Sequence, residues 1–481
     1  MGRFSWRILL PLAFSLALVL GAVCPALTDA SAPIAVQISS TPIGKSTRYI
    51  GACEGNVDFE PADLVDLGIN TYRIYGGMSR WELEEDDGVY GSPSIAQIKQ
   101  NPNIIPWDRW DSVMSAPKTG SDYAFSKKLN DRDLWQGSAR TIFEALKQNN
   151  IRPVITIRNV DSRYNPAWAR RLNPPNSEAD RNEWWEHVFA TVYWLNVRND
   201  YRVDDFEIHN EPDAPTLGWQ GNQNDYFELV RIASEAIAYV YNTYLPERTF
   251  HIHAPKTRQD SRWPKQALAS IPNYFDTVNV HNYSLDVSTY TRRVRNWIDK
   301  SELAYAPLWI GEWGTYTAGY SDLEFSLNLI KNLIRMSQPG YAHVYGSHLF
   351  SLYDWGHDRD FEGLINAQGD RTLSYYAFRM AIRALQGGRN VLQIASSDPS
   401  LTVMATQQDP STTFLLLVNP QRRDRNIEAY FPNLTSAAQV IAWEFSQSNL
   451  DTPIATLNLE EGSLSFGLPA KSSRLIRISS S

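Results

Sequence analysis

The stretch that decides the fold is FEIHNEPD, residues 206–213, in which a short strand pattern ends on Asn210 and Glu211. A second stretch of the same kind is LWIGEWG, residues 308–314, which carries Glu312. Each stretch places a carboxylate at the end of a predicted β-strand. Because the carboxyl ends of parallel strands open at one face of an α/β fold, we expect the two carboxylates to share a site.

The surrounding sequence from about residue 47 to 384 alternates short apolar or β-branched runs with amphipathic helical stretches, a pattern typical of repeated βα units. It predicts eight strands, at residues 49–53, 71–75, 153–157, 205–209, 249–253, 277–280, 308–311 and 345–351. Helical patterns lie between them, for example at 139–148, 184–197, 226–241 and 322–335. Eight such units predict a (β/α)8 TIM barrel over residues 31–384.

The segment from residue 76 to about residue 135 is too long for an ordinary connection between a strand and a helix. It is rich in Trp, Pro, Gly and acidic residues, and we predict an elaborated loop over the barrel mouth. Its Trp107, Trp110 and Trp135 either line sugar subsites or form the loop's own hydrophobic core.

After residue 385 the pattern changes to short strands separated by turn signals, at 401–405, 413–418, 427–431, 438–445 and 473–478. This pattern predicts a C-terminal antiparallel β-sandwich over residues 385–481. A leader strand at 34–38, within residues 31–46, is expected to join it. Only Trp443 of the 16 Trp residues lies in this region, so a sugar-stacking surface is expected in the barrel.

The N-terminus reads as a secretory signal peptide over residues 1–30, with Arg3 and Arg7, an apolar run over 8–23 and Ala30 before the predicted cleavage site. It implies a secreted or periplasmic protein without stable membrane insertion. An uncleaved anchor is one alternative. A lipoprotein attached through Cys24 is another, which the bulky residue 23 before that cysteine disfavours.

Charge and cysteine content narrow the function classes further. Removal of residues 1–30 takes away two Arg and one Asp, which changes the formal net charge from −8 to −9. An acidic chain is not expected to bind nucleic acid. Cys53 would be the single remaining cysteine, so an internal disulfide is not possible.

The spacing of the two carboxylates fits the predicted barrel. Glu211 follows the fourth strand and Glu312 ends the seventh, so the 101 positions between them hold three βα units. Each unit is then about 34 residues long, in line with the 30 or more that a βα unit needs. Both side chains therefore reach the same mouth.

Asn-Glu-Pro after the fourth strand and Gly-Glu at the end of the seventh resemble clan A of the glycoside hydrolases, whose members place their general acid/base and their nucleophile at these positions. The resemblance implies a retaining β-glycoside hydrolase in which Glu211 is the general acid/base and Glu312 the nucleophile. It also implies that Asn210 binds the 2-hydroxyl of the sugar.

Four further positions match the clan's pattern and are expected to bind substrate or support the nucleophile. They are Arg73 at the end of the second strand, His281 and Tyr283 after the sixth, and Trp355 after the eighth. Arg73 and Tyr283 would favour the charged form of Glu312, and Trp355 would be the floor on which the sugar stacks.

Within the clan, GEWG at 311–314 looks like family 5 endoglycanases. FEGLIN at 361–366, leading into YYAF at 375–378 with a terminal sandwich, looks more like family 39 xylosidases and exopolysaccharide hydrolases. The expected partner is therefore a poly- or oligosaccharide, for example a plant polysaccharide or a bacterial exopolysaccharide.

Three alternatives remain at this point. A transglycosylase would form the same covalent intermediate and differ only in its acceptor. A catalytically inactive barrel would bind carbohydrate without cleaving it. His251 and His253 alternate along one strand and so share a face, as metal ligands would, but no third ligand accompanies them at suitable spacing; no metal and no other cofactor is expected.

Overall fold

The computed structural model describes residues 32–53, 61–81, 93–116, 126–129, 132–136, 138–157, 166–214, 219–314, 321–340, 343–353, 363–366, 368–431, 438–457 and 462–479. Residues 33–481 form one compact unit. Among the helices within these ranges, none combines the length and the apolar character that crossing a bilayer requires.

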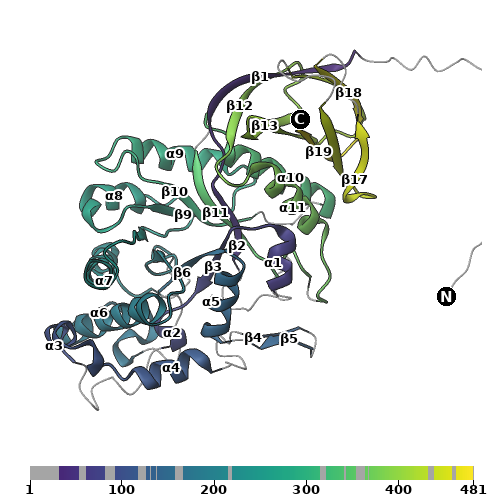
Figure 1. The fold of residues 1–481 in the computed structure, drawn as a ribbon. Coiled ribbons are helices and arrows are strands. Elements are labelled where there is room, and N and C mark those ends of the chain that lie inside the picture. The colour runs from purple at the N-terminus through teal and green to yellow at the C-terminus, as the bar shows by residue number, and fades with distance from the viewer. Residues whose placement is uncertain are drawn as a thin grey trace, which may run out of the picture. The chain divides into compact units, whose positions relative to one another are not determined.

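The predicted TIM barrel is confirmed. Eight parallel strands follow one another in the sheet order β8-β7-β6-β3-β2-β11-β10-β9 (Figure 1). A parallel bridge between His253 and Thr277 links the two ends of this order, so the sheet nearly closes. The strands are β2 (Tyr49–Cys53), β3 (Thr71–Tyr75), β6 (Arg152–Thr156), β7 (Asp205–Glu207), β8 (His251–His253), β9 (Val278–Asn282), β10 (Leu308–Trp313) and β11 (Val344–Phe350).

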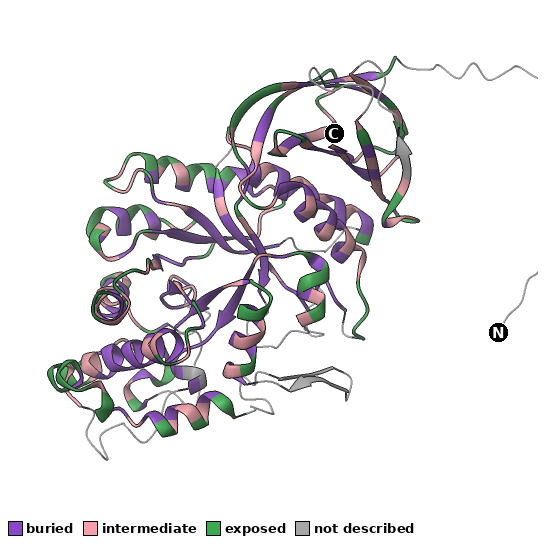
Figure 2. Ribbon diagram, in the orientation of Figure 1, coloured by how far each residue is buried: buried purple, intermediate pink, exposed green. Residues whose placement is uncertain are grey.

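Each barrel strand is followed by a helix on the outside of the sheet. Figure 2 shows barrel strands that are mostly buried and helices that expose one side. Polar N-caps with capping boxes begin four of these helices, at Ser138, Ser177, Asn222 and Ser321. The helices are α1 (Pro61–Leu67), α5 (Ala139–Gln148), α6 (Glu178–Val192, continued by η4, Tyr193–Arg198), α7 (Gln223–Tyr244), α8 (Trp263–Ser270), α9 (Ser288–Asp299), α10 (Asp322–Ser337) and α11 (Leu373–Leu385).

The long segment after β3 has secondary structure of its own: α2 (Met78–Trp81), α3 (Ile95–Gln100), α4 (Trp107–Ser115) and a hairpin of β4 (Ser126–Leu129) and β5 (Arg132–Gln136). Trp107 and Trp110 are buried, and Trp107 stacks on Tyr193 at a centroid distance of 5.0 Å. These two residues therefore serve the hydrophobic core. The side chain of Trp135 lies outside the described part of the structure.

The C-terminal region is a nine-stranded sheet in the order β17-β16-β19-β14-β13-β12-β1-β15-β18. Its strands are β1 (Ile34–Lys45), β12 (Asn390–Ser396), β13 (Thr402–Asp409), β14 (Thr412–Asn419), β15 (Arg425–Tyr430), β16 (Gln439–Phe445), β17 (Leu450–Leu457), β18 (Ser463–Leu468) and β19 (Ser472–Ser479). Ile427 of β15 and Val440 of β16 belong to one buried cluster, so the sheet folds over on itself around a core of its own.

Two features of this sheet differ from the predicted pattern. The leader strand β1 pairs antiparallel with β12 but parallel with β15, so the sheet is mixed rather than wholly antiparallel. Strands β12, β17 and β18 were not predicted. Pro453 lies within β17, and a proline is tolerated there because β17 is an edge strand.

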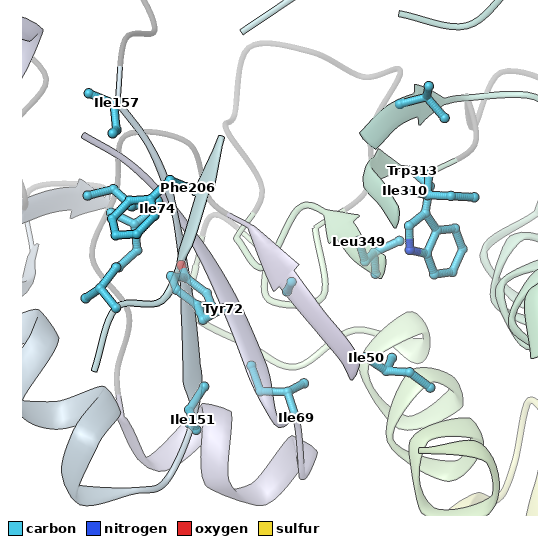
Figure 3. Packing of buried hydrophobic residues seen from close by; sticks show 14 of the residues in the cluster. Ile50, Ile69, Tyr72, Ile74, Ile151, Ile157, Phe206, Ile310, Trp313 and Leu349 are labelled. Carbon is cyan, nitrogen blue, oxygen red and sulfur yellow. The ribbon is translucent and has the colours of Figure 1, made fainter. Parts of the chain in front are cut away.

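The barrel strands alternate between two kinds of face. Side chains such as Ile50, Tyr72 and Leu349 belong to the large apolar cluster shared with the helices (Figure 3). The opposite faces carry polar and charged residues that meet inside the barrel, as described below. Strands must also approach closely: a Cβ atom on Gly51 of β2 would lie 1.9 Å from the carbonyl oxygen of Thr71 on β3.

We therefore expect Gly51→Ala to destabilise the barrel by more than the roughly 1–3 kcal/mol of ordinary core overpacking, because the obstructing atom is backbone and cannot rotate away. Urea unfolding and Tm would measure the loss. Gly467→Ala is the matched control, since nothing lies within 4 Å of its added Cβ atom. Equal stability of the two variants would contradict this account of the strand packing.

Candidate active site

The centre of the site is the guanidinium of Arg73 on β3, which is 1% exposed. Its Nε donates to Oε2 of Glu207 at 2.6 Å, and its Nη1 donates to Oε1 of Glu312 at 2.7 Å. Its Nη2 donates to Oδ1 of Asn210 at 3.0 Å. The structure thus brings together three predicted site residues, Arg73, Asn210 and Glu312, around one rigid donor group.

Glu207 lies beneath the site and was not predicted to take part in it. Its Oε2 lies 2.7 Å from Nζ of Lys256, and its Oε1 accepts a hydrogen bond of 2.7 Å from Nδ2 of Asn279. Two buried cations, Arg73 and Lys256, thereby face two buried carboxylates, Glu207 and Glu312. A buried charge without a partner costs several kcal/mol, so this pairing offsets the cost of burying these four charges in the barrel.

Glu312 on β10 is held by more donors than the sequence suggested. Its Oε2 accepts a hydrogen bond of 2.7 Å from the hydroxyl of Tyr283, and its Oε1 accepts one from Tyr75 in addition to that from Arg73. Burial acts to raise the pKa of Glu312, but His281 and Arg73 outweigh it and hold the pKa well below its usual range. Glu312 is therefore ionised at neutral pH.

Tyr75 is the donor to Glu312 that sequence reasoning missed. It lies two residues after Arg73 on β3, and residues two apart on a strand point to the same side. That alternation was the available signal.

Glu211 lies just beyond β7, on backbone in an unusual conformation. His209 has φ 64° and Glu211 has φ 42°, both in the left-handed region that non-glycine residues rarely adopt. A turn follows directly, with the amide of Ala214 donating to the Glu211 carbonyl at 3.0 Å. Such conformations cost of order 1–3 kcal/mol and gather at functional sites. Here they accompany a carboxylate that is partly exposed.

His281 on β9 connects the two predicted catalytic carboxylates. Its Nδ1 lies 2.5 Å from Oε1 of Glu211 and 3.1 Å from Oε2 of Glu312. An oxygen of Glu211 and one of Glu312 lie within 4.8 Å of each other. Burial lowers the pKa of His281, but Glu312 and Glu211 more than compensate and raise it to about 9.

The set Glu211, His281 and Glu312 is also the group of side chains, within the described ranges, that is close enough to hold a metal ion. The imidazole of His281 already contacts both carboxylates through its Nδ1 atom. A cation would have to displace the proton between His281 and the carboxylates, and the pKa of His281 opposes that loss below about pH 9. Neither member of the His251 and His253 pair joins this set: His251 pairs with Asp276 and His253 with Asp205.

The structure explains why a glycine precedes Glu312. A Cβ atom at position 311 would lie 2.4 Å from Oδ1 of Asn279, the atom that accepts the Gly311 amide at 2.9 Å. Glycine is therefore needed directly before Glu312. The predicted sugar platform, Trp355, lies outside the described residues.

Several solved structures of glycosidases have a similar fold. A glucosidase from Croceicoccus marinus superimposes with a TM-score of 0.66 at 13% identity, covering 94% of this chain and 100% of that one. A family 30 subfamily 8 xylanase from Clostridium acetobutylicum has a TM-score of 0.64 at 12% identity, covering 92% and 99%. A family 39 β-xylosidase from Caulobacter crescentus has a TM-score of 0.59 at 16% identity, covering 93% and 99%.

At the level of sequence, no family model and no curated protein matches this chain. The structural likeness therefore shows that the chain has the barrel-and-sheet fold of these enzymes, over nearly its whole length.

The geometry around His281 makes its titration a direct test of the site. Glu312→Gln removes the largest contribution that raises the pKa of His281, so we expect this pKa to fall from about 9. NMR titration of the imidazole would measure it. Because the wild-type folded value exceeds the unfolded one of about 6.5, this contribution to stability is complete below about pH 6.5 and is lost as the pH rises through about 9.

Glu228→Gln on α7 is the control for that titration, since Glu228 pairs with Arg231 away from the site. A pKa of His281 that is the same in both variants would show that His281 does not sense Glu312.

Proposed function

We propose that this protein is a retaining β-glycoside hydrolase that cleaves a poly- or oligosaccharide by double displacement. The observation that carries the proposal is the separation of Glu211 and Glu312, which have oxygen atoms within 4.8 Å of each other. Retaining glycosidases hold their two carboxyl groups about 5–5.5 Å apart, whereas inverting ones need about 6.5–9.5 Å to admit a water molecule.

In the first step, Glu312 attacks the anomeric carbon while Glu211 delivers the proton that it shares with His281 to the glycosidic oxygen. The different surroundings of the two groups support these roles. Glu312 is buried and holds its charge through Arg73, Tyr75 and Tyr283. The Glu211 side chain is 13% exposed and borders an open pocket from which a leaving group can depart.

In the second step, Glu211, having lost its proton, takes one from a water molecule that attacks the same carbon. The bond from that carbon to Glu312 then breaks and returns the electron pair to the carboxylate. Asn210 is suited to bind the sugar 2-hydroxyl, because Arg73 occupies its Oδ1 and leaves the Nδ2 amide group to donate. That contact strengthens in the transition state.

The activities of the structural relatives support the reaction class, because a glucosidase, a xylanase and a β-xylosidase all act on glycosides. For this chain the proposed substrate is a plant polysaccharide or a bacterial exopolysaccharide. Transfer to a sugar acceptor uses the same intermediate and is the second candidate, which the open pocket beside Glu211 favours by offering an acceptor a place.

We further propose that the protein acts outside the cytoplasm, with residues 1–30 removed as a signal peptide. Arg3, Arg7 and the apolar run over 8–23 motivate this proposal.

The catalytic roles predict two different kinetic signatures. Glu312→Gln is expected to lower kcat on an aryl β-glycoside by at least about 10³-fold, because no covalent intermediate can form. Glu211→Ala is expected to slow turnover of poor leaving groups most, because their departure needs a proton. On an activated aryl β-glycoside, azide is expected to restore the rate of this variant by attacking the glycosyl-enzyme and releasing a β-glycosyl azide. Steady-state rates and product NMR would measure both effects.

Glu235→Gln on α7 is the matched control for these variants, as a carboxylate outside the site. Near wild-type rates in both Glu312→Gln and Glu211→Ala would refute the proposed mechanism.

Export makes a separate prediction. Intact-mass analysis of protein recovered from the medium or periplasm of a bacterial host is expected to show a chain that begins near Ser31. If the protein is instead found in the membrane fraction with the mass of the full-length chain, residues 1–30 act as an uncleaved anchor.

A further inference from the structure

A pocket of about 730 Å³ lies beside Glu211, and neither Arg73 nor Glu312 lines it. Its wall is the turn between β8 and α8, residues 258–263, together with Asp213, Gln266 and Tyr283. A general acid must contact the glycosidic oxygen, so space that borders Glu211 and not Glu312 lies beyond that oxygen. The pocket is therefore positioned to receive the leaving group.

Two arginines and three carboxylates line this pocket, and each carboxylate already has a partner: Glu211 pairs with His281, Asp213 with Arg258 and Asp260 with Arg293. Arg258 and Arg262 both line it and are exposed, and Asp260 is already paired with Arg293 at 3.0 Å. Arg258 lies 3.7 Å from the carboxylate of Asp213, and burial raises the pKa of that aspartate. Within the described part of the chain, Arg262 has no carboxylate partner at all.

The pocket also has an aromatic wall. Trp263 opens α8, is half-buried, and packs against Tyr226 at a centroid distance of 5.8 Å. Behind it the turn is fixed, because Gln259 accepts the amide of Tyr283 at 2.9 Å. An indole beside two guanidinium groups offers a sugar both a face to stack on and a bidentate partner for a carboxylate.

We propose that this pocket is a leaving-group subsite for a uronic acid, a sugar unit whose carboxylate binds Arg262 and Arg258 while its ring lies against Trp263. The proposal rests on the proposed function and narrows it. The substrate class becomes an acidic polysaccharide in which the bond cleaved is the one that joins the glycosyl unit to a uronate.

The test uses the second step of the proposed reaction, because the acceptor in that step must bind in the pocket beside Glu211. The full enzyme is first treated with the 2,4-dinitrophenyl 2-deoxy-2-fluoro-β-glycosides of glucose and xylose, and intact mass with peptide mapping shows whether Glu312 is labelled. Acceptors then restore activity: an acceptor hydroxyl attacks the anomeric carbon, its proton goes to Glu211, and the bond to Glu312 breaks. The acceptors are methyl β-D-glucuronide and methyl β-D-glucoside, which differ only in the carboxylate.

We expect the glucuronide to restore activity at least about tenfold more efficiently than the glucoside, after correction for reactivation by water. Arg262→Gln is expected to remove most of this preference, and 0.5 M NaCl, chosen as roughly a threefold excess over physiological ionic strength, is expected to weaken it. Arg422→Gln, which changes an exposed arginine of the C-terminal sheet, is expected to retain it.

The failures are distinguishable. If neither reagent labels Glu312, the proposed function is wrong, and the proposed uronate subsite is then rejected as well. Two results would retain the proposed hydrolase activity but reject the uronate subsite. In the first, Glu312 is labelled and the two acceptors restore activity equally. In the second, Arg262→Gln retains the preference for the glucuronide.

Discussion

The fold and the candidate site depend on one buried guanidinium. Arg73 reaches from β3 to Glu207 on β7, to Glu312 on β10 and to Asn210 beyond β7, so a single planar group sets the relative positions of three strand ends. Removing any carboxylate partner would leave a charge in the barrel without compensation, at a cost of several kcal/mol. The same contacts hold the proposed nucleophile ionised and in place, so the stability of the barrel and the chemistry at its mouth are linked.

The network of polar contacts around Arg73 continues into the interior of the barrel. Asn279 donates to Glu207 at 2.7 Å, accepts from the Gly311 amide at 2.9 Å and lies 3.2 Å from Nδ1 of His253, whose Nε2 is 3.0 Å from Asp205. Hydrogen-bonded side chains thus run down the inside of the barrel where many barrels pack apolar layers. A polar interior of this kind is specific only when its members are satisfied, and it makes each of these positions sensitive to substitution.

The turn after β8 differs from the strand ends in the exposure of its side chains. The strands hold the proposed catalytic groups through buried, charge-paired contacts, whereas residues 258–263 carry two exposed arginines and the half-buried Trp263 beside Glu211. Barrel enzymes commonly place their reacting groups on the strand ends and their recognition residues on the loops, because the sequence of the loops at the carboxyl end can vary without disturbing the core.

The sequence by itself determined the eight barrel strands and the place of Glu211 and Glu312 at their ends, because periodicity and turn residues are local signals. The catalytic roles of these two residues stay predictions, as does that of Trp355. Only the tertiary structure decided that Tyr75 and Arg73 share Glu312, that Glu207 and Lys256 complete the charge balance, and that β1 pairs parallel with β15. These choices join residues tens to hundreds of positions apart, and which buried charge meets which is fixed by three-dimensional packing rather than by neighbours in the chain.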